Sequence, residues 1–326
     1  MKTLHIRALT LALTGAAIAV GSTLGGCERK SELSGWRAEM KEVRFAMMAS
    51  EEDPTLTRKL DLYKDYFARA TGLPVRLYEA SDYNGKIQAI SSGQVDITLL
   101  ASASYANVDA QIGELAKPIL TVRRADGELG YYSMFLVRAD SPYHELADLK
   151  GKTMGYVDLN STSGYLYPRA KMRKEGIDPD TFFGKVAIAG GHTQAIMALE
   201  NGQFDATVIN VGGGDPVAGF TTGAQFTMAR RGLVKLEDFR PVWTVGPIAT
   251  TAVVVRSDRP QAFIDLMRGA MAALPYDEPE TWEGGGQTDG TTLTSVDREH
   301  YREVIDLRHE ELVRRRTGAS AGPASS

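Results

Sequence analysis

Cysteine is almost absent from this chain of 326 residues, which contains a single one, Cys27. No disulfide can form within a monomer, so the fold must depend on a hydrophobic core rather than on a disulfide framework. None of the five histidines lies in a His-x-x-x-His or His-Glu-x-x-His pattern. These absences argue against a zinc site, and we expect neither a metal nor a cofactor.

Strong charge of one sign and long apolar runs are lacking as well. The net charge is -4 and the sequence pI is about 5.8, so nothing draws the chain to nucleic acid. After the N-terminal region, no run of 18 apolar residues could span a bilayer. No Gly-x-Ser-x-Gly elbow surrounds Ser161 or Ser163, and no base and orienting group accompany them in the sequence. A hydrolase that uses either serine is therefore the weakest alternative, and we predict that the chain is not an enzyme.

The N-terminus carries the most specific local signal. Two basic residues precede an apolar stretch over residues 8–20 that is too short to cross a bilayer comfortably. Leu-Gly-Gly-Cys27 follows, a pattern typical of the lipobox of bacterial lipoproteins, whereas a simple secretory peptide with an incidental cysteine is the alternative. We predict a signal peptide over residues 1–26, a lipidated Cys27 that starts a tether over residues 27–37, and a location on the periplasmic side of a cell membrane.

Strand and helix patterns alternate along the chain after the tether. Continuous apolar runs predict buried strands, and apolar residues at helical spacing predict helices between them. In the first part of the chain, the predicted strands cover residues 43–49, 74–78 and 95–100, and the predicted helices cover residues 56–70 and 86–91. This alternation is typical of a largely parallel sheet with helices on its faces.

One unit of this pattern occurs twice. The segment Ile87–Leu100 resembles Ile196–Ile209: each is an amphipathic helix, a Gly-Gln turn and an Asp that precedes a buried strand. Gly93 and Gly202 stand where a helix ends in a left-handed residue. Chance use of a common helix-turn-strand unit is the alternative, but two similar α/β lobes explain the pattern better.

Two long extended segments, Tyr131–Arg138 and Pro241–Arg256, flank the second unit. We interpret them as paired crossover strands between two lobes, after which two amphipathic helices return to the first lobe. The predicted limits are residues 38–134 and 246–316 for lobe 1, residues 135–245 for lobe 2, and residues 317–326 for a disordered tail.

Small hydroxyl residues mark the clearest candidate site. Ser161, Thr162 and Ser163 follow a predicted strand and precede a helical run, so their hydroxyls and the free backbone N–H groups can point at one oxyanion. A helix N-cap without a ligand is the alternative. His192 follows Gly-Gly in the next strand-to-helix loop, at the end of a strand where α/β sheets bind ligands; a lone surface histidine is the alternative there.

An ordered series of motifs over residues 42–310 resembles the phosphate/phosphite/phosphonate-binding proteins of ABC transporters. The matching segments are Ala49–Pro54, Ser81–Tyr83, Gly93–Asp96, Ser102–Tyr105, Asp148–Gly155, Asn160–Tyr165, Gly191–His192 and Gly202–Asp205. The resemblance implies an α/β fold of the two-lobed type II periplasmic binding protein kind. In that fold each lobe is a mostly parallel sheet flanked by helices, two crossover strands join the lobes, and the protein closes on its ligand by hinge motion.

The resemblance also implies which residues bind the ligand, because in the family tyrosines of the first lobe face a Ser-Thr-Ser helix start and a histidine of the second. Carried over by motif, the candidates are Tyr83, Tyr105, Ser161, Thr162, Ser163 and His192, with Tyr132 or Tyr131 at the first crossover and Tyr132 as our choice. The chain departs from the family where carboxylates hold an amine, since Asn210 and Thr250 or Thr251 are neutral there. Thr193 also replaces a residue that is often acidic or an amide, so a compact oxyanion is favoured over an aminoalkylphosphonate.

These observations together predict a monomeric substrate-binding lipoprotein. We expect it to capture a small phosphorus oxyanion (phosphite, phosphate or phosphonate) between two lobes and to deliver it to the permease of an ABC transporter. The alternative is a periplasmic oxyanion sensor that presents its ligand-bound form to a membrane histidine kinase.

Overall fold

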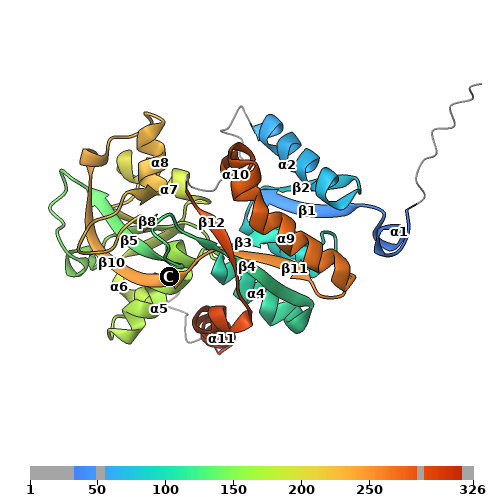
Figure 1. Ribbon diagram of the computed structural model, residues 1–326. Coiled ribbons are helices and arrows are strands. Elements are labelled where there is room, and N and C mark those ends of the chain that lie inside the picture. Colours follow the sequence, from blue (N-terminus) through green and yellow to red (C-terminus); the bar gives the residue numbers. More distant parts are fainter. Residues whose placement is uncertain (1–32, 49–55, 285–289, 318–326) are drawn as a thin grey trace, which may run out of the picture. The chain divides into compact units, whose positions relative to one another are not determined.

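The computed structural model describes residues 33–48, 56–284 and 290–317. It contains two β-sheets, each with helices packed on both faces (Figure 1). The predicted signal peptide, Cys27 and most of the tether lie outside the described residues, as does the predicted tail beyond Thr317.

The last residues of the predicted tether belong to the fold. Helix α1 (Trp36–Met40) begins inside the range assigned to the tether. Arg37 Nε donates to the carbonyl of Thr71 at 2.6 Å, and the rings of Trp36 and Phe263 lie 5.8 Å apart. Trp36 and Arg37, which the predicted tether includes, thus contact the folded part of the chain.

The first sheet has the strand order β12-β4-β11-β3-β1-β2. Its strands are β1 (Val43–Met48), β2 (Val75–Ala80), β3 (Ile97–Leu100), β4 (Ala116–Arg123), β11 (Ala252–Arg256) and β12 (Thr292–Ser295). Strand β1 pairs in parallel with β2 and β3, whereas β11 and β12 add antiparallel pairs around β4. The predicted strand and helix alternation thus builds the parallel half, and the end of the chain completes the sheet.

Helices cover both faces of the first sheet (Figure 1). They are α2 (Leu56–Thr71), α9 (Gln261–Asp277) and α10 (Pro279–Gly284) on one face, and α3 (Tyr83–Ser91) and α4 (Ser102–Ile112) on the other. Strand β11 shows why two cores form: Val253 and Val255 face the α2 and α9 side, and Ala252 and Val254 face α3 and α4. Side chains that alternate along a strand bury both faces of a central sheet.

The second sheet has the order β10-β5-β8-β6-β7, with β9 paired to β8. Its strands are β5 (Gly130–Arg138), β6 (Thr153–Tyr156), β7 (Lys185–Ile188), β8 (Ala206–Gly212), β9 (Thr222–Gly223) and β10 (Phe239–Ala249). The helices are α5 (Tyr167–Lys174), α6 (Pro179–Phe182), α7 (His192–Glu200) and α8 (Ala224–Arg230). Strand β6 is parallel to β7 and β8, the same local arrangement that β1 has with β2 and β3.

The repeated unit makes the same hydrogen bonds in both sheets. Asp96 accepts from the backbone N–H of Arg44 at 2.8 Å, and Asp205 accepts from that of Thr153 at 2.8 Å. In both copies the paired residues are 52 positions apart in the sequence. Gly93 and Gly202 have φ values of 78° and 70°, the left-handed conformation predicted for them. The internal repeat is therefore a structural one.

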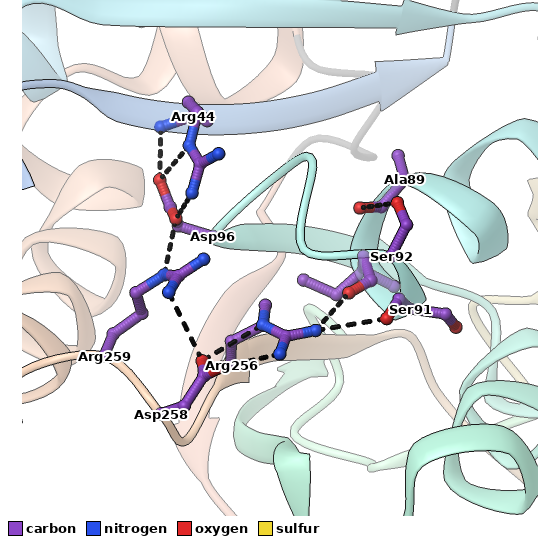
Figure 2. A network of polar contacts seen from close by, with 9 residues as sticks. Arg44, Ala89, Ser91, Ser92, Asp96, Arg256, Asp258 and Arg259 are labelled. Carbon is purple, nitrogen blue, oxygen red and sulfur yellow. Dashed lines mark hydrogen bonds and ion pairs between the residues drawn. The ribbon is translucent and has the colours of Figure 1, made fainter.

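Asp96 also organises a buried ionic network (Figure 2). Its carboxylate is fully buried and pairs with the guanidinium groups of Arg44, at 2.6 Å, and Arg259, at 2.7 Å. Asp258 links Arg259 to Arg256, whose Nη1 donates to carbonyls at the end of α3. Removing either cationic partner would leave the buried carboxylate of Asp96 without a matching charge, which destabilises the fold. Through Arg256, the network also connects the end of α3 to the sheet.

The chain passes from the first sheet to the second between β4 and β5, and returns between β10 and β11. Strands β5 and β10 pair with each other along most of their length within the second sheet. The residue limits that we assigned to the two lobes stay predictions. Among the described residues, no helix combines the length and apolarity needed to cross a membrane, and no cluster of side chains is suited to a metal ion.

Candidate functional site

The Ser-Thr-Ser segment forms a tight, buried helix start. Residues Thr162–Leu166 make a π-helical turn, η3, that leads directly into α5. Ser161 Oγ accepts from the N–H of Gly164 at 3.1 Å, and a Cβ at Gly164 would lie 2.4 Å from that of Val157. Ser161 therefore caps the helix, as the simpler interpretation held, and the glycine permits the close approach that this requires.

The same segment lines a cavity of about 400 Å³. Residues from both sheets and their flanking loops contribute to its wall. Polar side chains in its wall include Tyr83, Tyr131, Ser161, Thr162, Ser163 and His192, and the other neutral polar ones are Thr193, Asn210, Thr222, Thr227, Thr250, Thr251 and Thr291. None of the described residues that line the cavity is Asp or Glu.

The internal repeat explains why residues from distant parts of the chain meet here. Tyr83 is the first residue of α3 and His192 the first of α7. Tyr83 precedes Asp96 by as many residues as His192 precedes Asp205, so the two residues occupy equivalent positions in the two repeats. Two equivalent helix starts, one from each sheet, thus face the same cavity.

The structure brings together most of the predicted site residues, but not Tyr132. Adjacent residues of a strand point to opposite faces, so only one of the two tyrosines of β5 can reach the cavity. Tyr131 lines the cavity, whereas Tyr132 packs in the core of the second sheet, with its ring 5.1 Å from that of Phe220. Of the two crossover tyrosines, Tyr131 and not our choice Tyr132 is therefore the one that lines the cavity.

Tyr105, another predicted site residue, also lies away from the cavity. The matching segment Ser102–Tyr105 forms the first turn of helix α4. The helix carries Tyr105 into the core of the first sheet, where it is fully buried and its ring lies 5.0 Å from that of Tyr301. It does not line the cavity.

Burial keeps the two cavity tyrosines protonated. Burial raises the pKa of Tyr83 to about 12, while a hydrogen bond with the Ser161 side chain acts in the opposite direction. Burial also raises the pKa of Tyr131, which is hydrogen-bonded to Thr162 and Ser163. Both phenols are therefore available as hydrogen-bond donors at neutral pH.

His192 is neutral for the same physical reason. Burial lowers its pKa to about 4, because the imidazolium form loses hydration inside the cavity wall. Its Nδ1 atom is buried and has no hydrogen-bond partner in the part of the chain that the structure describes. A neutral imidazole with one nitrogen free of hydrogen bonds can bond to a polar ligand. A bound anion would raise the pKa of His192.

Thr162 joins the two sheets. Its Oγ1 accepts from the N–H of Ala103 at 2.8 Å and lies 3.2 Å from Ser102 Oγ, at the start of α4. Next to it, Ser104 and Asn107 of α4 hydrogen-bond to Asn160 at 3.0 and 2.9 Å. The segment that supplies the cavity hydroxyls from the second sheet thus rests on a helix of the first.

The comparisons with known proteins agree with this arrangement. The family model described as ABC transporter, phosphonate, periplasmic substrate-binding protein matches residues 45–301. The chain belongs to this family. Proteins of this periplasmic substrate-binding family serve transport rather than catalysis, in agreement with the prediction of a binding protein.

Individual relatives support the assignment. The phosphate-import protein PhnD of Mycolicibacterium smegmatis is 26% identical over 266 residues, which cover 79% of this chain and 80% of that protein. The phosphonates-binding periplasmic protein of Escherichia coli is 31% identical over 176 residues, about half of either chain at 52% and 51%. A binding protein component of an ABC phosphonate transporter from Pseudomonas aeruginosa has a TM-score of 0.67 at 22% identity, covering 87% of this chain and 90% of that one. The last likeness confirms the two-lobed periplasmic binding protein fold.

Two arginines of this family member escaped the sequence analysis. Arg124, just after β4, and Arg231, just after α8, both line the cavity. Neither lies in a motif, and no local pattern in the sequence distinguishes them from surface arginines. Only the folded arrangement of β4, α8 and the loop after β8 shows that they share one cavity.

Proposed function

We propose that this protein captures a phosphorus oxyanion in the cavity at Ser161–Ser163 and delivers it to the permease of an ABC transporter. The observation that carries the proposal is the composition of the cavity wall. Neutral hydrogen-bond donors from both lobes converge on it, and the described lining residues include no carboxylate.

This composition suits an oxyanion on physical grounds. Hydrogen bonds from neutral donors to an anion are stronger than those between neutral groups, and in a buried site they replace its hydration. A carboxylate in the wall would repel an anionic ligand or favour one that carries an amine. The family resemblance places such carboxylates at positions that hold Asn210, Thr250 and Thr251 in this chain, and all three line the cavity. The wall thus favours a phosphorus oxyanion over an aminoalkylphosphonate.

Each polar group has a distinct role in the proposal. Tyr83, Tyr131 and Ser163 donate their hydroxyl hydrogens to the ligand, and His192 donates a ring N–H. Ser161 caps the helix while its side chain also bonds to Tyr83. The ligand oxygens then accept from hydroxyls of both lobes, which couples capture to contact between the lobes.

The lipid anchor is part of the same proposal. Acylation of Cys27 would keep the binding protein at the periplasmic face of a membrane, close to the permease. The described residues offer no feature that favours the sensor alternative over transport. The names of two relatives refer to phosphate and to phosphonates, so phosphate, phosphite and phosphonates are the ligands to compare.

Titration calorimetry on residues 28–326 tests the proposal with phosphate, phosphite, methylphosphonate and sulfate. We expect at least one phosphorus oxyanion to bind, and Tyr83→Phe to weaken its binding about 10-fold or more, since a hydrogen bond to a charged group contributes about 1.5–3 kcal/mol. Tyr105→Phe is the matched control, because it removes a hydroxyl from a buried tyrosine outside the cavity.

Two results would contradict the proposal. One is the absence of binding by any phosphorus oxyanion to a protein whose folding has been verified by circular dichroism. The other is an equal loss of affinity in both tyrosine variants, which would point to a general effect on the fold.

A further inference from the structure

The cavity extends beyond the hydroxyl groups. At its inner end Ser161, Thr162 and Ser163 are at most 2% exposed, whereas Leu233 of the same wall is 49% exposed and Arg231 is exposed as well. The cavity of about 400 Å³ has room for more than a bare phosphate or phosphite ion. Its volume lies in the range of sites for organic ligands.

Apolar side chains line the wall along with the polar groups. Val122, Val211 and Met228 contribute to it and are largely buried. These side chains offer no hydrogen bond to an oxyanion, but they favour contact with a carbon chain. The wall therefore combines a polar inner end, apolar side chains and an exposed rim.

The charges in the wall are those of two arginines. Arg124 is buried and already engaged: Nη1 donates to the carbonyl of Gly130 at 2.6 Å, Nη2 donates to that of Gly214 at 3.1 Å, and the guanidinium pairs with Asp126. Arg231 makes no side-chain hydrogen bond or ion pair with any other residue within the described ranges. The positive charge of Arg231 is thus uncompensated at the rim.

We propose that the ligand is a phosphonate, or a phosphate monoester, whose carbon substituent carries a carboxylate that Arg231 binds. This inference rests on the proposed function, since the phosphorus group occupies the hydroxyl end. The planar guanidinium of Arg231 matches a carboxylate bidentately, whereas the charge of Arg124 is already paired with Asp126. The absence of Asp and Glu among the described lining residues leaves an amine in this position without an anionic partner.

A matched pair of ligands tests the inference by calorimetry. 3-Phosphonopropionate and propylphosphonate have the same number of chain carbons, but only the former carries a carboxylate. We expect 3-phosphonopropionate to bind at least 5-fold more tightly, and 2-aminoethylphosphonate to bind more weakly than either. The advantage should shrink between 50 and 500 mM NaCl, because Arg231 is exposed and its charge is screened.

A matched pair of variants identifies the residue. Arg231→Gln should abolish the advantage of 3-phosphonopropionate over propylphosphonate, because only 3-phosphonopropionate presents a carboxylate to Arg231. Arg230→Gln should preserve the advantage, because Arg230 is an exposed neighbour that bonds to Thr227 and does not line the cavity.

The outcomes separate the two proposals. Equal affinities for 3-phosphonopropionate and propylphosphonate, with methylphosphonate bound, would overturn the carboxylate inference and leave the proposed function intact. An advantage that survives in Arg231→Gln would also overturn it. Failure of phosphate, phosphite and every phosphonate to bind would overturn the proposed function itself.

Discussion

His192 illustrates how a single residue in the cavity couples stability to pH. Its pKa of about 4 in the folded protein lies below the ordinary value of 6.5 because burial opposes the charged form. When the pH falls from 6.5 to 4, the unfolded chain takes up a proton at this residue and the folded protein does not. The free energy of unfolding therefore decreases with falling pH in this window.

We predict that His192→Gln reduces this pH dependence in the ligand-free protein. At 1.36 kcal/mol per pKa unit, the wild type should lose up to about 3 kcal/mol at His192 between pH 6.5 and pH 4. Urea unfolding at pH 7, 5 and 4 measures the difference between wild type and variant. Burial also lowers the pKa of His300, but this residue is present in both proteins, so its contribution cancels in the difference between them.

The exposed His309 provides the control for this experiment. His309→Gln should follow the wild-type pH dependence. If His192→Gln lost stability as steeply as the wild type did, the interpretation of a neutral, buried imidazole would be wrong.

At the scale of elements, the start of α4 and the segment before η3 depend on each other. The first N–H groups of a helix have no partner within that helix, and Thr162 of the other lobe accepts one of them from Ala103. Asn107 of α4 adds an amide hydrogen bond to Asn160. Neither asparagine lines the cavity, yet both hold together the elements that form it.

We predict that Asn107→Ala weakens ligand binding without changing the cavity wall. The variant loses the 2.9 Å bond to Asn160, which contributes about 1 kcal/mol, so the arrangement with both lobes in contact becomes less populated. Calorimetry with methylphosphonate should show about a 5-fold loss of affinity.

Gln111→Ala is the control for the α4 contact. Gln111 bonds to Asn107 at 3.3 Å on the exposed side, so its removal leaves the bond between the lobes in place. Unchanged affinity in Asn107→Ala, or the same loss in both variants, would show that this contact does not support binding.

At the scale of the whole molecule, the end of the chain connects the two lobes. Helix α11 (Arg302–Arg316) packs against α4 of the first lobe. It also forms ion pairs with α5 of the second, from Glu303 to Lys171 at 3.0 Å and from Glu311 to Arg173 at 3.2 Å. Any hinge motion of the lobes must therefore move α11 with one of them or break these pairs.

Membrane anchoring is the prediction that concerns the whole protein. We expect the full chain, expressed in a bacterium, to incorporate labelled palmitate and to appear in the membrane fraction, because two or more acyl chains give stable anchoring. Cys27→Ser should abolish the label and release the protein. Ser31→Ala, a change in the same region, should retain the palmitate label and the membrane location. A wild-type protein without the label would refute the lipobox interpretation.

The sequence by itself determined the elements and their repetition. Gly93 and Gly202, with Asp96 and Asp205, follow local rules of helix termination and strand pairing, so their pattern could be read from one chain. The helix start at Ser161–Ser163 was equally local, because capping depends on neighbours in the sequence.

Only the tertiary structure decided which side chains share the cavity. Tyr131 and Tyr132 are chemically identical neighbours, and the pairing of β5 in the second sheet selects which one faces inward. Tyr105 lies in the core because α4 starts three residues before it, and Arg124 and Arg231 reach the cavity from segments without any motif. Local sequence patterns reflect interactions between near neighbours, whereas membership of a cavity depends on the direction of each side chain and on contacts between distant segments.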